Sequence, residues 1–382
     1  MLLNDILHFA KTQIPFYQKR IIDSDYSSFP YITKKTINNH LHSMISKDIV
    51  RLGFSALALC HTSGTTGEPT IVYWQSNDLL KADVNLWRWR FHYYGITPSS
   101  PCLLFYDNEF KRKSSLFGIN IQDILKNDFA TAFLSLIRKE KIEWIRVQPS
   151  ILRIISEKIE GNLNLNHCCL KLIETTGEVL TEEERSYYSN LFKVPVADLY
   201  GSEETRAIAY SCPCGKKHIL TENVFVETIN SNSSGMGEAV VTVLNNTAMP
   251  LIKYNLQDLI KIELISRCPC GNNSPVITNI LGRSSRCIYS KNGVLYSESL
   301  INHRFEAINN DLGHPIQMYR VQYFQATGVF EINVSLRSDF DGWKEVVRKR
   351  IISQFTGEDK TIVTFSDLKN VRCKNVAFEV MP

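Results

Sequence analysis

Residues 62–67 combine four hydroxyl side chains with two glycines, and this composition points to anion chemistry. In order they are Thr62, Ser63, Gly64, Thr65, Thr66 and Gly67. Glycine lets backbone amides approach an anion closely, and the hydroxyls add hydrogen-bond donors. Strand-like residues 71–74 follow, so the segment is expected to lead into a sheet. It lacks the Gly-Lys-Ser/Thr ending of a Walker A loop, and the pattern predicts either a phosphate-binding loop or a solvated turn.

The tetrapeptide Cys-Pro-Cys-Gly occurs twice and supplies Cys212, Cys214, Cys268 and Cys270. Four thiolates form a tetrahedral zinc site, and proline and glycine favour tight turns that aim sulfur atoms at one point. The C-x-C spacing is tighter than the usual C-x₂-C, so an inner ligand could be displaced; His218 is the candidate substitute, and the sequence leaves open which four of the five residues bind. We predict a structural zinc site that joins two β segments, with free thiols in turns as the alternative. Catalytic zinc is disfavoured because four protein ligands leave no open position.

The bulk composition is that of an ordinary globular protein. The 382 residues are 44% hydrophobic and 21% charged, and the net charge of +4 is too small to indicate nucleic-acid binding. No apolar run approaches the roughly 18 residues of a membrane span. The N-terminus has an early acid and no basic region before its apolar residues, unlike a secretion signal. We expect a cytoplasmic protein that does not bind membranes.

Periodic patterns predict alternating helices and strands up to about residue 224. Residues 76–94 have the spacing of a long helix, and 103–106 and 144–147 are typical of strands. Thr181 and Glu184 have the spacing of a capping box. Strands that alternate with helices indicate a parallel α/β core.

The later part of the chain changes to β character and ends in a mixed block. We expect an α/β protein with a large N-terminal domain, residues 1–284, built from α/β layers and a β subdomain. Residues 285–382 are expected to form a small α+β C-terminal domain.

Residues 62–67 resemble the phosphate loop of the acyl-adenylate-forming enzymes, the superfamily of acyl-CoA synthetases, peptide-synthetase adenylation domains and luciferases. Other segments resemble the family's motifs in the same order, at 176–178, 198–204, 254–258 and 282–285. With residues 29–35 they are most similar to the phenylacetate–CoA ligase branch, in a short form. The resemblance extends from about residue 30 to at least residue 283.

The resemblance implies a site for ATP and AMP. The wall of the adenine pocket would be formed by Thr176, Gly177 and Glu178. Tyr200, followed by Gly201, would stack on adenine, and Asp198 would accept a hydrogen bond from its amino group. The ribose hydroxyls would bind Asp258, and Mg²⁺, which prefers oxygen ligands, would bind Glu204.

The resemblance also implies a moving C-terminal domain that acts as a lid. Arg283 lies in the segment that resembles the hinge before this domain. A lysine on the lid reaches the reacting bond in the family, and Lys374 is the expected equivalent, with Lys369 as the second candidate.

Four positions depart from the family pattern: Glu68 for a loop lysine, Glu203 for Thr/Ser, Leu256 for threonine and Ser285 for the hinge acid. An acid at 68 would repel phosphate if it pointed inward. These departures bear on catalytic rate and domain rotation more than on the fold.

The implied reaction joins a small carboxylic acid to the α-phosphate of ATP and releases pyrophosphate. The acyl group would then pass to CoA or to the phosphopantetheine thiol of a carrier protein. An amine acceptor or a reductase partner would use the same adenylate. Because residues 107–113 are polar, a polar or amino-bearing acid suits the chain as well as phenylacetate.

Two rival functions remain open. A degenerate adenylase would bind nucleotide or a partner without turnover, and Glu68 and Glu203 favour it. A zinc-knuckle interaction module is disfavoured by the length of the chain and by the order of its motifs. The sequence allows a monomer or a homodimer.

Overall fold

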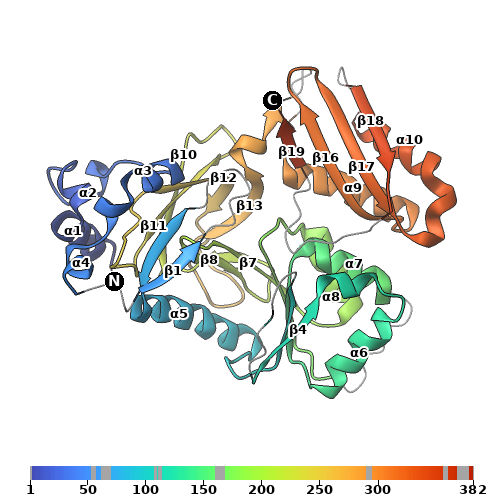
Figure 1. Cartoon of the computed structure of the whole chain (residues 1–382), viewed down its shortest axis with the longest axis horizontal. Coiled ribbons are helices and arrows are strands. Elements are labelled where there is room, and N and C mark those ends of the chain that lie inside the picture. Colours follow the sequence, from blue (N-terminus) through green and yellow to red (C-terminus); the bar gives the residue numbers. More distant parts are fainter. Residues whose placement is uncertain are drawn as a thin grey trace. The chain divides into compact units, whose positions relative to one another are not determined.

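The chain forms two compact units. The computed structural model describes residues 2–52, 57–61, 70–106, 110, 114–159, 168–289, 295–355, 360–367 and 378–381. The first unit comprises Met1–Gly95 and Leu199–Asn279, and the second comprises Ile96–Asp198 and Ile280–Pro382. Figure 1 shows their labelled helices and strands. This grouping leaves the domain boundary at residues 284–285 a prediction.

The first unit begins with short helices that lead to a hairpin and one long helix. These elements are α1 (Leu3–Gln13), α2 (Pro15–Gln18), η1 (Tyr26–Ser28), α3 (Lys34–Met44), α4 (Lys47–Leu52), β1 (Leu57–His61), β2 (Ile71–Gln75) and α5 (Ser76–Tyr94). Strands β1 and β2 pair antiparallel. The predicted helix at 76–94 is confirmed, and it ends at Gly95, whose φ of 66° suits glycine at a helix C-terminus.

The rest of the first unit is antiparallel sheet. Its strands are β8 (Arg206–Ser211), β9 (Lys217–Ile219), β10 (Val224–Ile229), β11 (Met236–Val243), β12 (Tyr254–Glu263) and the start of β13 (Val276–Arg283). Strand β7 (Val196–Ser202) carries the chain in from the second unit. Antiparallel pairs join β10 to β11, β11 to β12, and β13 to β9. The predicted change to β character after residue 224 is confirmed.

The second unit contains the parallel α/β core. Its elements are β3 (Cys102–Tyr106), β4 (Leu116–Asn120), η2 (Ile121–Leu125), α6 (Phe129–Lys139), β5 (Trp144–Val147), α7 (Pro149–Ile159), β6 (Leu172–Thr176) and α8 (Glu182–Phe192). Strand β3 pairs parallel with β4 and β5, and β5 with β6. At the start of α8, Thr181 and Glu184 each accept a hydrogen bond from the other's backbone N–H at 3.1 Å. The parallel core and the capping box are both confirmed.

The C-terminal part of the second unit is an α+β layer, as predicted. Its elements are η3 (Ser284–Arg286), β14 (Ile288–Tyr289), β15 (Leu295–Tyr296), α9 (Glu298–Leu312), β16 (Ile316–Phe324), β17 (Val329–Leu336), η4 (Ser338–Trp343), α10 (Lys344–Gln354), β18 (Lys360–Phe365) and β19 (Phe378–Met381). The sheet order is β18-β17-β16-β19, and α9 and α10 pack with it around Phe305, Phe330 and Phe355. Within the described ranges, no helix is long and apolar enough to cross a bilayer.

Candidate functional site

Tyr200 and Gly201 lie near the end of β7, and Glu204 lies in the turn from β7 to β8. A Cβ on Gly201 would lie 2.3 Å from the backbone oxygen of Arg206, so only glycine fits. The strand register also shifts between Tyr200 and Gly201, and such a bulge bends the strand locally. The glycine of the motif therefore shapes the turn that aims Tyr200 and Glu204.

Tyr200 and Asp258, predicted to contact adenine and ribose, are direct neighbours. The Tyr200 hydroxyl donates a hydrogen bond to the Asp258 carboxylate at 2.8 Å. Asp258 lies on β12 and is half-buried, so its carboxylate is held in place without being sealed from solvent. These residues are 58 positions apart in the sequence, and the antiparallel sheet brings them together.

Glu204 is a buried carboxylate held by two donors. Its side chain is 4% exposed and lies 3.2 Å from the Lys34 ammonium. The Tyr254 hydroxyl donates to the same carboxylate oxygen at 3.2 Å. Burial alone would raise the pKa of Glu204, but the Lys34 charge and hydrogen bonds hold it below its ordinary value. Glu204 is therefore ionised at neutral pH, and Mg²⁺ commonly binds proteins through one or two carboxylates.

Sequence reasoning missed Lys34 as a site residue. Two features of the sequence mark the segment around Lys34. Residues 29–35 resemble the phenylacetate–CoA ligase branch, and Thr33 is a residue type that begins helices, as it does at α3, where its side chain accepts from the Thr36 N–H. Neither feature predicts that Lys34 pairs with Glu204, because 170 residues separate the two in the sequence.

The second unit positions the other predicted adenine residues. Glu178 accepts hydrogen bonds from the backbone and the hydroxyl of Ser150, both at 2.9 Å, at the start of α7. Gly177, with a φ of 86°, makes the turn that leads to this carboxylate. Asp198 is buried and accepts from the Thr175 hydroxyl at 2.9 Å. Thr176 ends β6, so Gly177 and Glu178 lie at the carboxyl end of this strand, where α/β sheets commonly bind ligands, and Asp198 lies within β7.

Several predicted residues lie outside the described ranges. These are residues 62–67, Glu68, Lys369 and Lys374. Arg283 is described at the end of β13, after Gly282, whose φ is 97°. The roles of all of these residues remain predictions.

An aromatic pair lies at the carboxyl end of β3, where the polar segment 107–113, from which the class of acid was predicted, begins. The rings of Tyr106 and Phe110 stack with centroids 5.1 Å apart. Gly118 on β4 lies beneath them, because a Cβ there would approach both rings to 2.8 Å. The polar composition of residues 107–113 concealed this apolar surface.

Four residues of the predicted metal site converge in the first unit. The ligand atoms of Cys212, His218, Cys268 and Cys270 all lie within 4.8 Å of one another. The Cys212 and Cys268 sulfurs are 3.9 Å apart, and the Cys270 sulfur is 3.4 Å from His218 Nε2. A tetrahedral zinc ion requires about 3.8 Å between sulfurs and about 3.6 Å between sulfur and nitrogen, given its usual bond lengths. The donor set therefore fits zinc.

The two cysteine tetrapeptides fold into the same turn. Gly215 donates its backbone N–H to the Cys212 oxygen, and Gly271 donates to the Cys268 oxygen, both at 2.9 Å. Both glycines have positive φ, 78° and 86°, which they adopt without strain. Cys214 is exposed and lies outside the four-residue group, so the structure favours His218 in its place.

The surroundings of His218 suit a metal ligand. Its Nδ1 lies 3.1 Å from the Ser274 backbone oxygen, which orients Nε2 toward the sulfurs. Burial lowers the pKa of His218, and neutral imidazole is the form that binds a metal. Tyr93 and Trp89 of α5 pack beside the group, with the Tyr93 hydroxyl 3.9 Å from the Cys270 sulfur.

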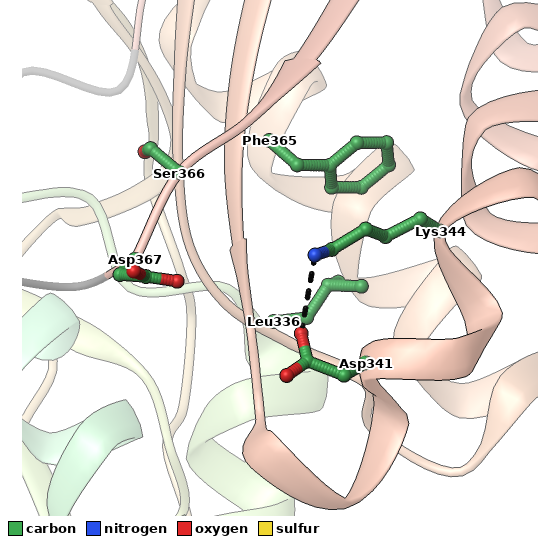
Figure 2. A pocket seen from close by; sticks show the side chains of 6 residues that line it. All are labelled: Leu336, Asp341, Lys344, Phe365, Ser366 and Asp367. Atoms are coloured by element: carbon green, nitrogen blue, oxygen red, sulfur yellow. Dashed lines mark ion pairs between the residues drawn. The ribbon is translucent and has the colours of Figure 1, made fainter.

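A separate pocket of about 370 Å³ lies in the C-terminal part of the second unit. Figure 2 shows its lining, formed by Leu336, Asp341, Lys344, Phe365, Ser366 and Asp367. The Lys344 ammonium pairs with Asp341 at 3.3 Å, and both side chains are largely exposed. None of the predicted site residues is among these six, and the pocket receives no functional assignment.

No family model matches the chain. Phenylacetate-coenzyme A ligase of Pseudomonas putida is 22% identical over 399 residues, which cover 94% of this chain and 86% of the relative. A solved 2-hydroxyisobutyryl-CoA ligase in its postadenylation state, in complex with R3-HIB-AMP, has a TM-score of 0.75. It is 14% identical, and the match covers 99% of this chain and 87% of that one. The chain is similar in sequence to this phenylacetate-coenzyme A ligase, and its fold is similar to that of the solved 2-hydroxyisobutyryl-CoA ligase.

An open conformation of the same 2-hydroxyisobutyryl-CoA ligase, in complex with 2-HIB-AMP and CoA, has a TM-score of 0.62. It is 15% identical, and the match covers 100% of this chain and 90% of that one. These matches confirm the predicted adenylate-forming fold, a large sheet-rich region followed by a smaller α+β part.

Glu203, one of the four positions that depart from the family pattern, forms an ion pair. Glu203 stands where the family has a hydroxyl, and its carboxylate lies 3.5 Å from Arg206. Arg206 also pairs with Asp83 of α5 at 3.1 Å. The Glu203 side chain is 61% exposed, so this pairing is weak and only partly offsets the added negative charge.

Proposed function

We propose that this protein activates a small carboxylic acid with ATP as an acyl-adenylate and transfers the acyl group to CoA. The observation that carries the proposal is the cluster in the first unit, where Tyr200 bonds to Asp258 and Glu204 lies buried beside Tyr254. Of these, Tyr200, Asp258 and Glu204 are the residues to which the family resemblance assigns adenine, ribose and Mg²⁺. The solved ligase with 2-HIB-AMP and CoA supports the order of adenylation followed by thioester formation.

The proposed chemistry assigns each group a separate task. A carboxylate oxygen of the acid attacks the α-phosphorus of ATP, and pyrophosphate leaves. Tyr200 and Asp258 hold the nucleoside, so that binding energy positions the α-phosphate for this attack. Bound Mg²⁺ would neutralise charge on the phosphates, and Glu204 supplies a carboxylate for it. In the second step the thiol sulfur attacks the acyl carbon, and AMP leaves.

We also propose that the group of three cysteines and His218 binds one structural zinc ion. The distances among the four ligand atoms and the hydrogen bond to Ser274 support this assignment. All four ligands come from the protein, so the ion would join two turns and take no part in the reaction.

The function is tested by pyrophosphate release and AMP formation with ATP, Mg²⁺, CoA and a panel of carboxylic acids. Aryl, hydroxy and amino acids belong in the panel, because the polar residues 107–113 and the stacked Tyr106 and Phe110 rings favour different classes of acid. Glu204→Gln should lower adenylate formation about 100-fold or more, as expected when one preorganised charged group is lost. Glu222→Gln, at an exposed position of the same unit, is the matched control and should retain the activity.

The rival is a degenerate adenylase that binds nucleotide without turnover. Glu203, largely exposed and weakly paired, favours it because an acid replaces a hydroxyl that the family places at the α-phosphate. ATP binding without pyrophosphate release for every acid in the panel would support the rival. Activity that appears in Glu203→Thr would then identify this acid as the cause.

A further inference from the structure

Lys34 is fixed at the nucleotide-site strand by backbone hydrogen bonds. Ile32, two residues earlier, donates its N–H to the Lys253 oxygen at 3.0 Å and accepts from the Asn255 N–H at 2.8 Å. These bonds attach the start of α3 to β12, the strand that carries Tyr254 and Asp258. The position of Lys34 therefore follows the strand that builds the predicted nucleotide site.

The two donors at Glu204 differ in their freedom to move. Tyr254 is fully buried, and its hydroxyl donates to the Glu204 carboxylate from within the core. The Lys34 side chain is 30% exposed, against 4% for Glu204, and a flexible four-carbon stem carries its ammonium. Lys34 is the partner that can leave Glu204 without opening the core.

Binding of a divalent cation to Glu204 would weaken the ion pair between Glu204 and Lys34. A divalent cation and an ammonium compete for the same carboxylate, since both are attracted to its negative charge. ATP brings several negative charges to a site that already holds the buried Glu204 carboxylate. An ammonium displaced from Glu204 would find its new counter-charge on these phosphates.

We propose that Lys34 is a phosphate-binding residue that neutralises Glu204 in the empty site and moves to the phosphates of ATP when a divalent cation binds Glu204. This inference rests on the proposed function, because it assumes that Glu204 faces bound nucleotide.

The proposal predicts opposite effects on two ligands, which a purely structural role would not produce. In Lys34→Met the affinity for Mg·ATP should fall about ten- to a hundred-fold, since a charged hydrogen bond is lost. The affinity for Mn²⁺ without nucleotide should rise, because the competitor for Glu204 is gone. Both are measured by calorimetry on the full chain, and Mn²⁺ binding is also measured by electron paramagnetic resonance.

Lys35→Met is the matched control, because Lys35 is the next residue of α3 and is exposed. It should leave both affinities unchanged. Lys34→Arg, which keeps the positive charge, should restore most of the ATP affinity and tests the inference even if Lys34→Met folds poorly.

The outcomes separate this inference from the proposed function. If the wild type binds Mg·ATP and Lys34→Met binds it equally well, the inference is wrong and the function stands. A parallel loss of ATP and Mn²⁺ binding in Lys34→Met, without rescue by Lys34→Arg, would also overturn it. If the wild type does not bind ATP, the proposed function fails, and the inference fails with it.

Discussion

Replacing Cys270 by serine should strongly destabilise the first unit, whereas the same replacement at Cys214 should not. The two residues occupy the same place in the repeated tetrapeptide, and both turns have the same geometry. Cys270 belongs to the four-residue group, and Cys214 is exposed outside it. Comparing the two variants therefore separates the effect of losing a metal ligand from the effect of replacing a cysteine by serine.

The size of the effect follows from the loop that the ion closes. Cys212 and Cys268 are separated by 56 residues. Treating the ion as a covalent cross-link, closure of such a loop removes chain entropy worth about 4 kcal/mol from the unfolded state. For a unit of this size about 1 kcal/mol shifts the melting temperature by about 2–4 °C, so the expected loss is about 8–16 °C.

The assay is thermal unfolding with and without a zinc chelator, together with metal analysis of the purified protein. The wild type and Cys214→Ser should carry one zinc per chain and lose stability on chelation. Cys270→Ser should carry less zinc and melt at the lower temperature whether or not the chelator is present. Equal melting temperatures for the two variants, or a wild type without zinc that ignores the chelator, would refute the reasoning.

Three further predictions concern other parts of the chain. Burial raises the pKa of Glu306 from 4.5 to about 7, despite the Arg153 guanidinium at 3.2 Å. The stability that protonated Glu306 contributes is therefore present below pH 4.5 and is lost as the pH rises through about 7. Glu306→Gln should make the melting temperature less dependent on pH in this window, and an unchanged pH dependence would contradict the assignment. Asp258→Ala should weaken ATP binding by about 1–3 kcal/mol; Tyr200→Phe, which keeps the ring, should cost less, and calorimetry that ranks the two the other way would argue against the site. Lys374→Ala should lower adenylate formation about 100-fold and spare thioester formation from pre-made acyl-adenylate; equal loss in both half-reactions would show that the residue acts only through folding.

Local patterns predicted the local structure. The helix at 76–94 followed from its length and spacing, and the start of α8 followed from Thr181 and Glu184, which bond to each other across one helical turn. Such features depend on residues a few positions apart, so the sequence contains all the information they require. The parallel core followed in the same way from the alternation of strands and helices.

These local patterns could not predict contacts between residues that are far apart in the sequence. The pair of Lys34 and Glu204 depends on α3 being attached to β12, and no periodicity in the chain encodes that attachment. The choice of His218 over Cys214 depends on how a tight turn directs its two cysteines. The first sulfur of each turn points inward, but the second does so only in the turn that holds Cys270. The spacing of the tetrapeptide is identical in both turns, and it could not distinguish them.

One strand organises the predicted nucleotide site, and the metal group lies on the strands beside it. Strand β12 supplies Tyr254 to Glu204 and Asp258 to Tyr200, and its backbone fixes the segment before Lys34. In the sheet of the first unit, β12 is followed by β13 and β9, and β9 carries His218. A zinc ion that joins the turns next to β9 and β13 would hold these strands against unfolding without contacting the nucleotide. The proposed zinc ion would therefore stabilise the sheet that carries the proposed nucleotide site, although the motif residues of that site are separated by long stretches of sequence.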